Sequence, residues 1–191
     1  MVLMDQTLFM WISIVVIFAA GSLAHFLYEI AHHNKVIGLF TAVNESTWEH
    51  VKIAITPTLL WSLLDGFFFG TNPNYFTAKL ASLLILTFFI PMVYYSYRRV
   101  AKHSILPIDI TIFAVAIILA QMSFFAIIEQ PAVPYWATYL SAVATFIFFG
   151  AYMTLTLYPL RNIIFKDPIT GKYGFPAHRD LFKPAKKHKQ D

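Results

Sequence analysis

The sequence predicts an all-α membrane protein, a polytopic bundle of about five transmembrane helices, and two observations point to this fold class. The first is composition: 58% of the 191 residues are hydrophobic, only 13% are charged, and the mean hydropathy is +0.62. The second is that apolar residues form continuous runs instead of alternating with polar ones, which excludes transmembrane strands. The chain has no cysteine, so disulfides and thiolate metal sites are excluded as well.

Five apolar runs are long enough to cross a hydrocarbon core of about 30 Å, which takes roughly 20 helical residues. We place the spans at residues 8–30, 47–69, 77–97, 107–129 and 135–160. The second span contains Pro57 and Asp65, and we expect this helix to be kinked at Pro57. Residues 1–160 then form the transmembrane bundle, and residues 161–191 form a cytoplasmic tail.

Basic residues gather in alternate loops, which predicts the orientation because such loops stay in the cytoplasm. Two lysines flank the first loop, three basic residues lie in the third loop and three start the tail: Lys35 and Lys52, then Arg98, Arg99 and Lys102, then Arg161, Lys166 and Lys172. The second loop region offers only Lys79, the fourth loop offers none, and the amino terminus carries Asp5. We expect a multi-pass protein of the cell membrane, with the amino terminus outside and the carboxyl terminus in the cytoplasm.

Two groups of ionisable residues lie where the first span ends and the second begins. The first span ends with His25, Glu29 and His32, and the second follows the segment Asn44-Glu-Ser-Thr-Trp-Glu-His50. Both groups belong to the cytoplasmic side, so they should lie at the same depth. At about 100° per residue, the three residues of the first group share one stripe of the helix, which continues through Gly21. A small residue there would let another helix approach closely.

A capping role competes with a functional role in the second group. Ser46 followed three residues later by Glu49 matches a capping box, in which each side chain bonds the other residue's amide. Asn44 could cap the helix instead. We expect Ser46 and Glu49 to act as caps, but capping explains neither Glu45 nor His50.

Imidazole and carboxylate groups also ligate zinc, iron or manganese, and neighbouring helices of a bundle can present them. We expect one divalent metal ion of this kind, although the spacing lacks the strict pattern of a His-Glu-x-x-His motif. The candidate ligands are His25, Glu29, His50 and, at the start of the fourth span, Asp109. The candidate catalytic bases are Glu45 and Glu49. Asp65 and Lys79 fall near the outer face, where we expect a structural pair.

The tail contains a turn motif and a basic end. Asp167-Pro168 and Thr170-Gly171 favour a tight turn that folds back under the bundle. Residues 183–189 form a basic run, in which each charge near an anionic leaflet contributes about 1 kcal/mol. The expected partners are therefore the lipid bilayer and its anionic headgroups, and nucleic acid is not expected.

Four segments together resemble a family of small prokaryotic integral membrane proteins to which no function is assigned. They are His25-Phe-Leu-Tyr-Glu29, Gly38-Leu-Phe40, Asn44-Glu-Ser-Thr-Trp-Glu-His50 and Asp167-Pro-Ile-Thr-Gly-Lys-Tyr-Gly174. The resemblance covers most of the chain, and Asn-Glu-Ser-x-Trp-Glu-His is its most specific part. It implies a membrane bundle with a polar cluster on the cytoplasmic side, and it implies no reaction.

Three classes of function remain open, and whether the chain is an enzyme is undecided at this point. The first is a metal-dependent membrane enzyme, a hydrolase of a lipid or another amphipathic substrate. The second is a proton- or cation-coupled carrier or channel that uses the same acids and histidines as a relay. The third is a respiratory or assembly accessory subunit in which His25 and His50 ligate haem.

Overall fold

The computed structural model describes residues 5–177, and the secondary structure there is helical. The elements are α1 Gln6–Ile30, α2 Lys35–Gly38, α3 Thr47–Phe69, α4 Tyr75–Ala101, α5 Leu106–Ile128 and α6 Tyr135–Leu157. Within the described residues no β-strand forms, apart from a single bridge between Lys166 and Tyr173. The predicted all-α fold class is confirmed.

Five of these helices, α1 and α3 to α6, are long and apolar enough to cross a membrane. Their bounds follow the predicted spans closely, and the two main differences have local causes. The helix α4 continues beyond residue 97 to Ala101, because Arg98 and Arg99 suit the negative end of a helix dipole. The helix α6 ends at Leu157 instead of residue 160, because Pro159 disfavours a helical conformation at the residue before it.

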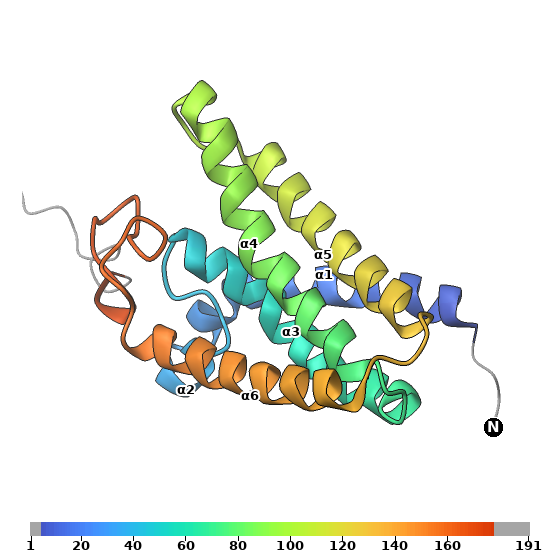
Figure 1. Ribbon diagram of the computed structural model, residues 1–191. Coiled ribbons are helices and arrows are strands. Elements are labelled where there is room, and N and C mark those ends of the chain that lie inside the picture. Colours follow the sequence, from blue (N-terminus) through green and yellow to red (C-terminus); the bar gives the residue numbers. More distant parts are fainter. Residues whose placement is uncertain (1–4, 178–191) are drawn as a thin grey trace, which may run out of the picture.

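The helices pack as a bundle in which α4 is central. It packs against α3, α5 and α6, while α1 packs against α3 and α5. Figure 1 shows α4 and α5 side by side as an antiparallel pair, with their connecting loop projecting away from the rest of the molecule. The buried apolar core lies among α1, α3, α4 and α5, and it includes Ile17, Val51, Ile55, Leu83, Leu86 and Ile117.

The helices α1 and α3 approach each other closely at the level of a proline. Pro57 lies inside α3 and has no amide hydrogen, so the carbonyl of Ile53 loses its helical donor. Gly21 of α1 lies directly beside that carbonyl: a Cβ atom on Gly21 would be 2.6 Å from the Ile53 oxygen and 2.6 Å from the Phe113 ring. The predicted role of a small residue at this position in helix packing is confirmed.

A buried ion pair joins α3 to α4 near the opposite end of the bundle. Lys79 Nζ lies 2.5 Å from Asp65 Oδ2, and both side chains are almost completely buried. The Tyr75 hydroxyl donates a hydrogen bond of 2.7 Å to the other oxygen of Asp65. The predicted structural pair is therefore confirmed, and Lys79 is not a loop residue.

The segment after α6 folds back onto the start of α3, as the turn motif predicts. Asp167 accepts hydrogen bonds from the amides of Ile169 and Thr170, and Gly171 has a φ of +70°. The Trp48 amide donates to the Ile164 carbonyl at 2.9 Å. The basic run at 183–189 lies outside the described residues.

Candidate functional site

Two histidines converge on one carboxylate at the end of the bundle where α1 ends and α3 begins. His25 Nε2 lies 3.7 Å from Glu45 Oε1, and His50 Nε2 lies 3.8 Å from Glu45 Oε2. The two imidazole rings are 5.5 Å apart, centroid to centroid. We call His25, Glu45 and His50 the imidazole–carboxylate cluster. The expectation that the two sequence groups meet is confirmed by these distances.

Local structure holds each member of the cluster in place. His25 lies on α1, about one and a half turns before its end, and His50 lies in the first turn of α3. Glu45 lies between them in a turn in which Asn44 Oδ1 accepts a 2.8 Å hydrogen bond from the Ser46 amide. The Nδ1 atom of His50 lies 3.0 Å from the Ser46 carbonyl oxygen, which orients the ring.

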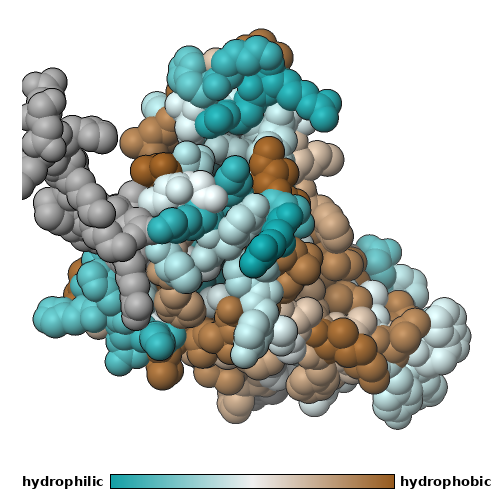
Figure 2. All heavy atoms as spheres, turned by 90° about the vertical axis from the view of Figure 1, so that its left-hand side faces the viewer, coloured by the Kyte–Doolittle hydropathy of each residue, from teal (hydrophilic) through white to brown (hydrophobic). Residues whose placement is uncertain are grey.

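The cluster is open to one side. The side chains of His25, His50 and Glu45 are 27%, 37% and 39% exposed, so a small ligand can reach them. Figure 2 looks onto this end of the molecule, where hydrophilic side chains gather above the hydrophobic sides of the bundle. His25 Nδ1 is buried and has no hydrogen-bond partner within the described residues.

Glu49 faces away from the cluster and belongs to a separate buried ion pair. Its Oε2 atom lies 2.6 Å from Lys52 Nζ and accepts a 3.0 Å hydrogen bond from the Val43 amide. Lys52 also donates to the Gly38 carbonyl at 2.9 Å. The predicted capping box is therefore wrong: Ser46 is the N-cap residue, but its side chain makes no capping hydrogen bond. Its amide is satisfied by Asn44, which leaves Glu49 free to pair with Lys52.

Three other candidate residues lie apart from the cluster. Glu29 is exposed, and its carboxylate forms no hydrogen bond or ion pair within residues 5–177, although its charge acts on His25 one turn away. His32 does not continue the stripe of α1, because the helix ends at Ile30 and His32 has a φ of 53°. Asp109 accepts hydrogen bonds from Tyr97 and Ser104, which close the α4–α5 loop. The structure therefore does not bring Glu29 or Asp109 together with the two histidines as one ligand set.

The ion pair of Lys52 with Glu49 was not predicted from the sequence, because Lys52 was counted only as a basic residue flanking the first loop. The Lys52 side chain is completely buried inside α3. A signal was present, because Glu49 and Lys52 are three residues apart in an apolar run and so share one helix face. Within the described part of the chain, no group of three or more His, Asp or Glu side chains has the arrangement of a metal site, and this includes the imidazole–carboxylate cluster.

Comparison with known proteins gives a family and no activity. A family model described as "Family of unknown function (DUF6512)" matches residues 2–175. No curated protein and no solved structure matches the chain.

Proposed function

The chain belongs to this family of unknown function, and we propose that its imidazole–carboxylate cluster binds one divalent transition-metal ion. The class of activity that such a site serves best is metal-dependent catalysis at the membrane surface. The ligands in this proposal are His25, His50 and Glu45. Glu45, which the sequence suggested as a base, takes the role of a ligand.

The orientation of the His50 ring carries the proposal. The Ser46 carbonyl oxygen can only accept a hydrogen bond, so the proton of a neutral His50 lies on Nδ1. Its Nε2 atom then presents a lone pair, and it faces the carboxylate of Glu45, which also accepts. A metal ion between these two acceptors would remove their repulsion, as would a second proton on the ring. A backbone carbonyl that fixes the tautomer in this way is common behind histidines that ligate metals.

The distances in the cluster are too long for a direct hydrogen bond and are compatible with a shared metal ion. Values of 3.7 and 3.8 Å exceed the range of a hydrogen bond between nitrogen and oxygen. Two ligands of a tetrahedral metal, each about 2.1 Å from the ion, lie about 3.4 Å apart. The observed separations exceed this spacing by a few tenths of an ångström, which small side-chain rotations can close.

The cluster also has the chemical character of a catalytic site. Two imidazoles and one carboxylate suit zinc, iron or manganese, and three protein ligands leave a position for water or substrate. A metal bound there would supply a Lewis acid. The exposed side of the cluster lies at the membrane boundary, which suits an amphipathic substrate. Glu49 is committed to Lys52, so the general base must come from outside this pair.

A proton- or cation-coupled carrier is the second candidate, and the buried charges of α3 favour it. This helix holds Glu49 with Lys52 near one end and Asp65 near the other, where Lys79 pairs with it. Ionisable residues inside a membrane often mark ion pathways. In a carrier, the imidazole–carboxylate cluster would be the entry point for the cation.

Elemental analysis of the detergent-purified protein tests the proposal. The wild type should carry close to one equivalent of metal per chain, and His50→Ala and His25→Ala should lose it. His103→Ala is the matched control, because His103 is an exposed histidine in the α4–α5 loop and should retain the metal. A wild type that binds no metal even when titrated with zinc would overturn the metal site, and proton flux in liposomes would then test the carrier. A Soret band would instead identify haem.

A further inference from the structure

A pocket of about 460 Å³ lies just beyond the end of α6, and we propose that it binds a phosphate group. The phosphate could be carried by an anionic lipid headgroup or by a soluble anion, since both present the same charged oxygens. The pocket is separate from the imidazole–carboxylate cluster, and the proposal does not depend on a metal.

The position of the pocket matches the depth of lipid headgroups. The helix α6 has 23 residues, so its length of about 34 Å spans a hydrocarbon core of about 30 Å. The pocket starts at Leu157, the last residue of α6, and includes Tyr158 and Pro159 directly after it. Its walls therefore lie where the membrane-spanning segment meets the polar boundary.

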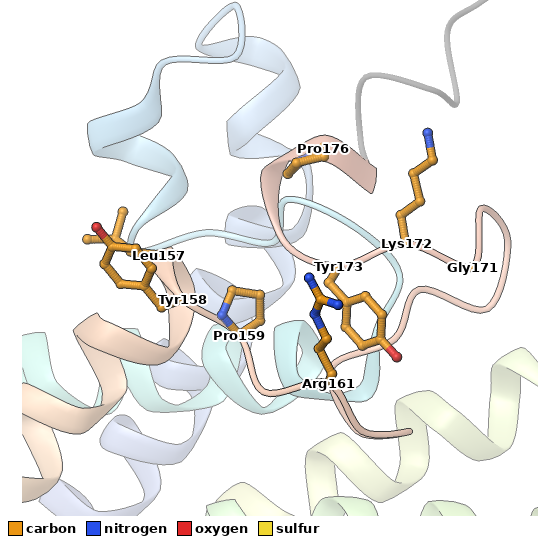
Figure 3. A pocket seen from close by; sticks show the side chains of 8 residues that line it. All are labelled: Leu157, Tyr158, Pro159, Arg161, Gly171, Lys172, Tyr173 and Pro176. Carbon is orange, nitrogen blue, oxygen red and sulfur yellow. The ribbon is translucent and has the colours of Figure 1, made fainter.

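Among residues 5–177, positive and aromatic side chains line the pocket and no acid does. Arg161, Lys172, Tyr158 and Tyr173 all line it. Figure 3 shows the Arg161 side chain beside the ring of Tyr173. Lys172 precedes Tyr173 in the chain, and its side chain points outward. An arginine fork can hold two phosphate oxygens at once, and lysine can add a second positive charge.

The only acid in residues 158–177 is withdrawn from the pocket. Asp167 is completely buried, and its carboxylate accepts from Ile169 and Thr170 within its own turn. Arg161 is exposed and makes no ion pair within the described residues. Between residues 158 and 177 the fold thus satisfies the one acid within its own turn and exposes Arg161, an arrangement that attracts anions.

Native mass spectrometry of the full chain, delipidated in a neutral detergent, tests the lipid as the source of phosphate. Phosphatidylglycerol and phosphatidylcholine are added in equal amounts, and the wild type should retain the anionic lipid with about a tenfold preference. Arg161→Gln combined with Lys172→Gln should lower this preference several-fold, with the remainder supplied by the basic run at 183–189. Arg99→Gln combined with Lys102→Gln removes the same charge from the α4–α5 loop and should keep it.

A second measurement tests the soluble anion. Inorganic phosphate, compared with chloride at equal ionic strength, should raise the melting temperature of the wild type more than that of the Arg161→Gln, Lys172→Gln variant if a free phosphate is the ligand. The proposed phosphate site is supported if the lipid preference or the phosphate-induced rise in melting temperature falls in this variant and is kept in the loop control. The proposal is overturned if neither anion distinguishes the variant from the wild type, or if the loop control loses the response equally. If the double variant does not fold, the single variant Lys172→Gln, at the exposed turn, replaces it in both measurements.

Discussion

At the scale of single residues, Lys52 shows how a membrane helix can hold a charge away from water. Its ammonium group and the Glu49 carboxylate are 2.6 Å apart, and their side chains are 0% and 3% exposed. Such desolvation is costly unless further hydrogen bonds satisfy the charges. Here the Val43 amide serves Glu49, and the Gly38 carbonyl serves Lys52. The pair therefore ties the start of α3 to α2 and to the loop that follows it.

Removing one partner of this pair should destabilise the protein strongly. Lys52→Met leaves the Glu49 carboxylate buried without its counter-charge, a change that costs about 3–5 kcal/mol. Unfolding in detergent, followed by circular dichroism, should show the loss. Lys35→Met, at an exposed lysine of α2, is the control and should change stability little. Adding Glu49→Gln to Lys52→Met should recover part of the loss, and equal stability of the two lysine variants would refute a structural role for the pair.

The turn before α3 leads to a second prediction, because Asn44 accepts the hydrogen bond from the Ser46 amide that the sequence assigned to Glu49. Its side chain accepts from the Ser46 amide and donates to the Gly174 carbonyl at 3.1 Å. Asn44→Ala should therefore lower the free energy of unfolding by about 1–3 kcal/mol. Ser46→Ala should have a smaller effect, because the serine side chain makes no capping bond. The reverse order in a thermal denaturation series would restore the capping box.

The residue types near the site could be predicted from sequence, but their pairing could not. His25, Glu45 and His50 stood out because polar groups at the end of an apolar run are uncommon. The sequence could not decide which carboxylate the histidines share, because Glu45 and Glu49 are four residues apart in one motif. The buried Lys52 settles this in the structure, since it takes Glu49 out of the cluster.

At the scale of helices, the contact between α1 and α3 depends on one missing side chain. A Cβ atom at Gly21 would lie 2.6 Å from the Ile53 carbonyl oxygen and from the Phe113 ring. Gly21→Ala should therefore force the helices apart and destabilise the bundle by about 1–3 kcal/mol. Gly150→Ala is the matched control, because no atom lies within 4 Å of its added Cβ. That variant should be neutral or more stable by up to about 1 kcal/mol in the same denaturation assay.

The outcome that would contradict this packing is equal stability of the two glycine variants.

The bounds of the helices were predictable from sequence, because each membrane span is set by local apolarity and length. Contacts between distant segments were not predictable. One example is the hydrogen bond between Asn44 and Gly174, which are 130 residues apart in the sequence. The turn at Asp167 could be recognised from its residues, whereas the surface on which it docks depends on the assembled bundle.

At the scale of the whole molecule, the two ends of the bundle differ more in exposed basic residues than the sequence suggested. Two of the lysines that were counted beside or near loops, Lys52 and Lys79, are buried in ion pairs and cannot contribute to the charge difference between loops. Because the helices alternate in direction, the remaining basic residues of the described chain all lie at or beyond one end. They are Lys35, Arg98, Arg99, Lys102, Arg161, Lys166 and Lys172.

This one-sided charge leads to the prediction that the end carrying the imidazole–carboxylate cluster faces the cytoplasm. The opposite end carries acids, Asp5 and Glu129, and no basic residue outside the buried pair with Asp65. A reporter fused after Asp191 should therefore be active in the cytoplasm, and one inserted at Asn72 should be active outside. Both reporters on one side would contradict the five spans, and exchanged sides would contradict the orientation. In the second case the metal, substrate or phosphate would have to reach these sites from outside the cell, because the cluster and the tail pocket lie at the same end of the bundle.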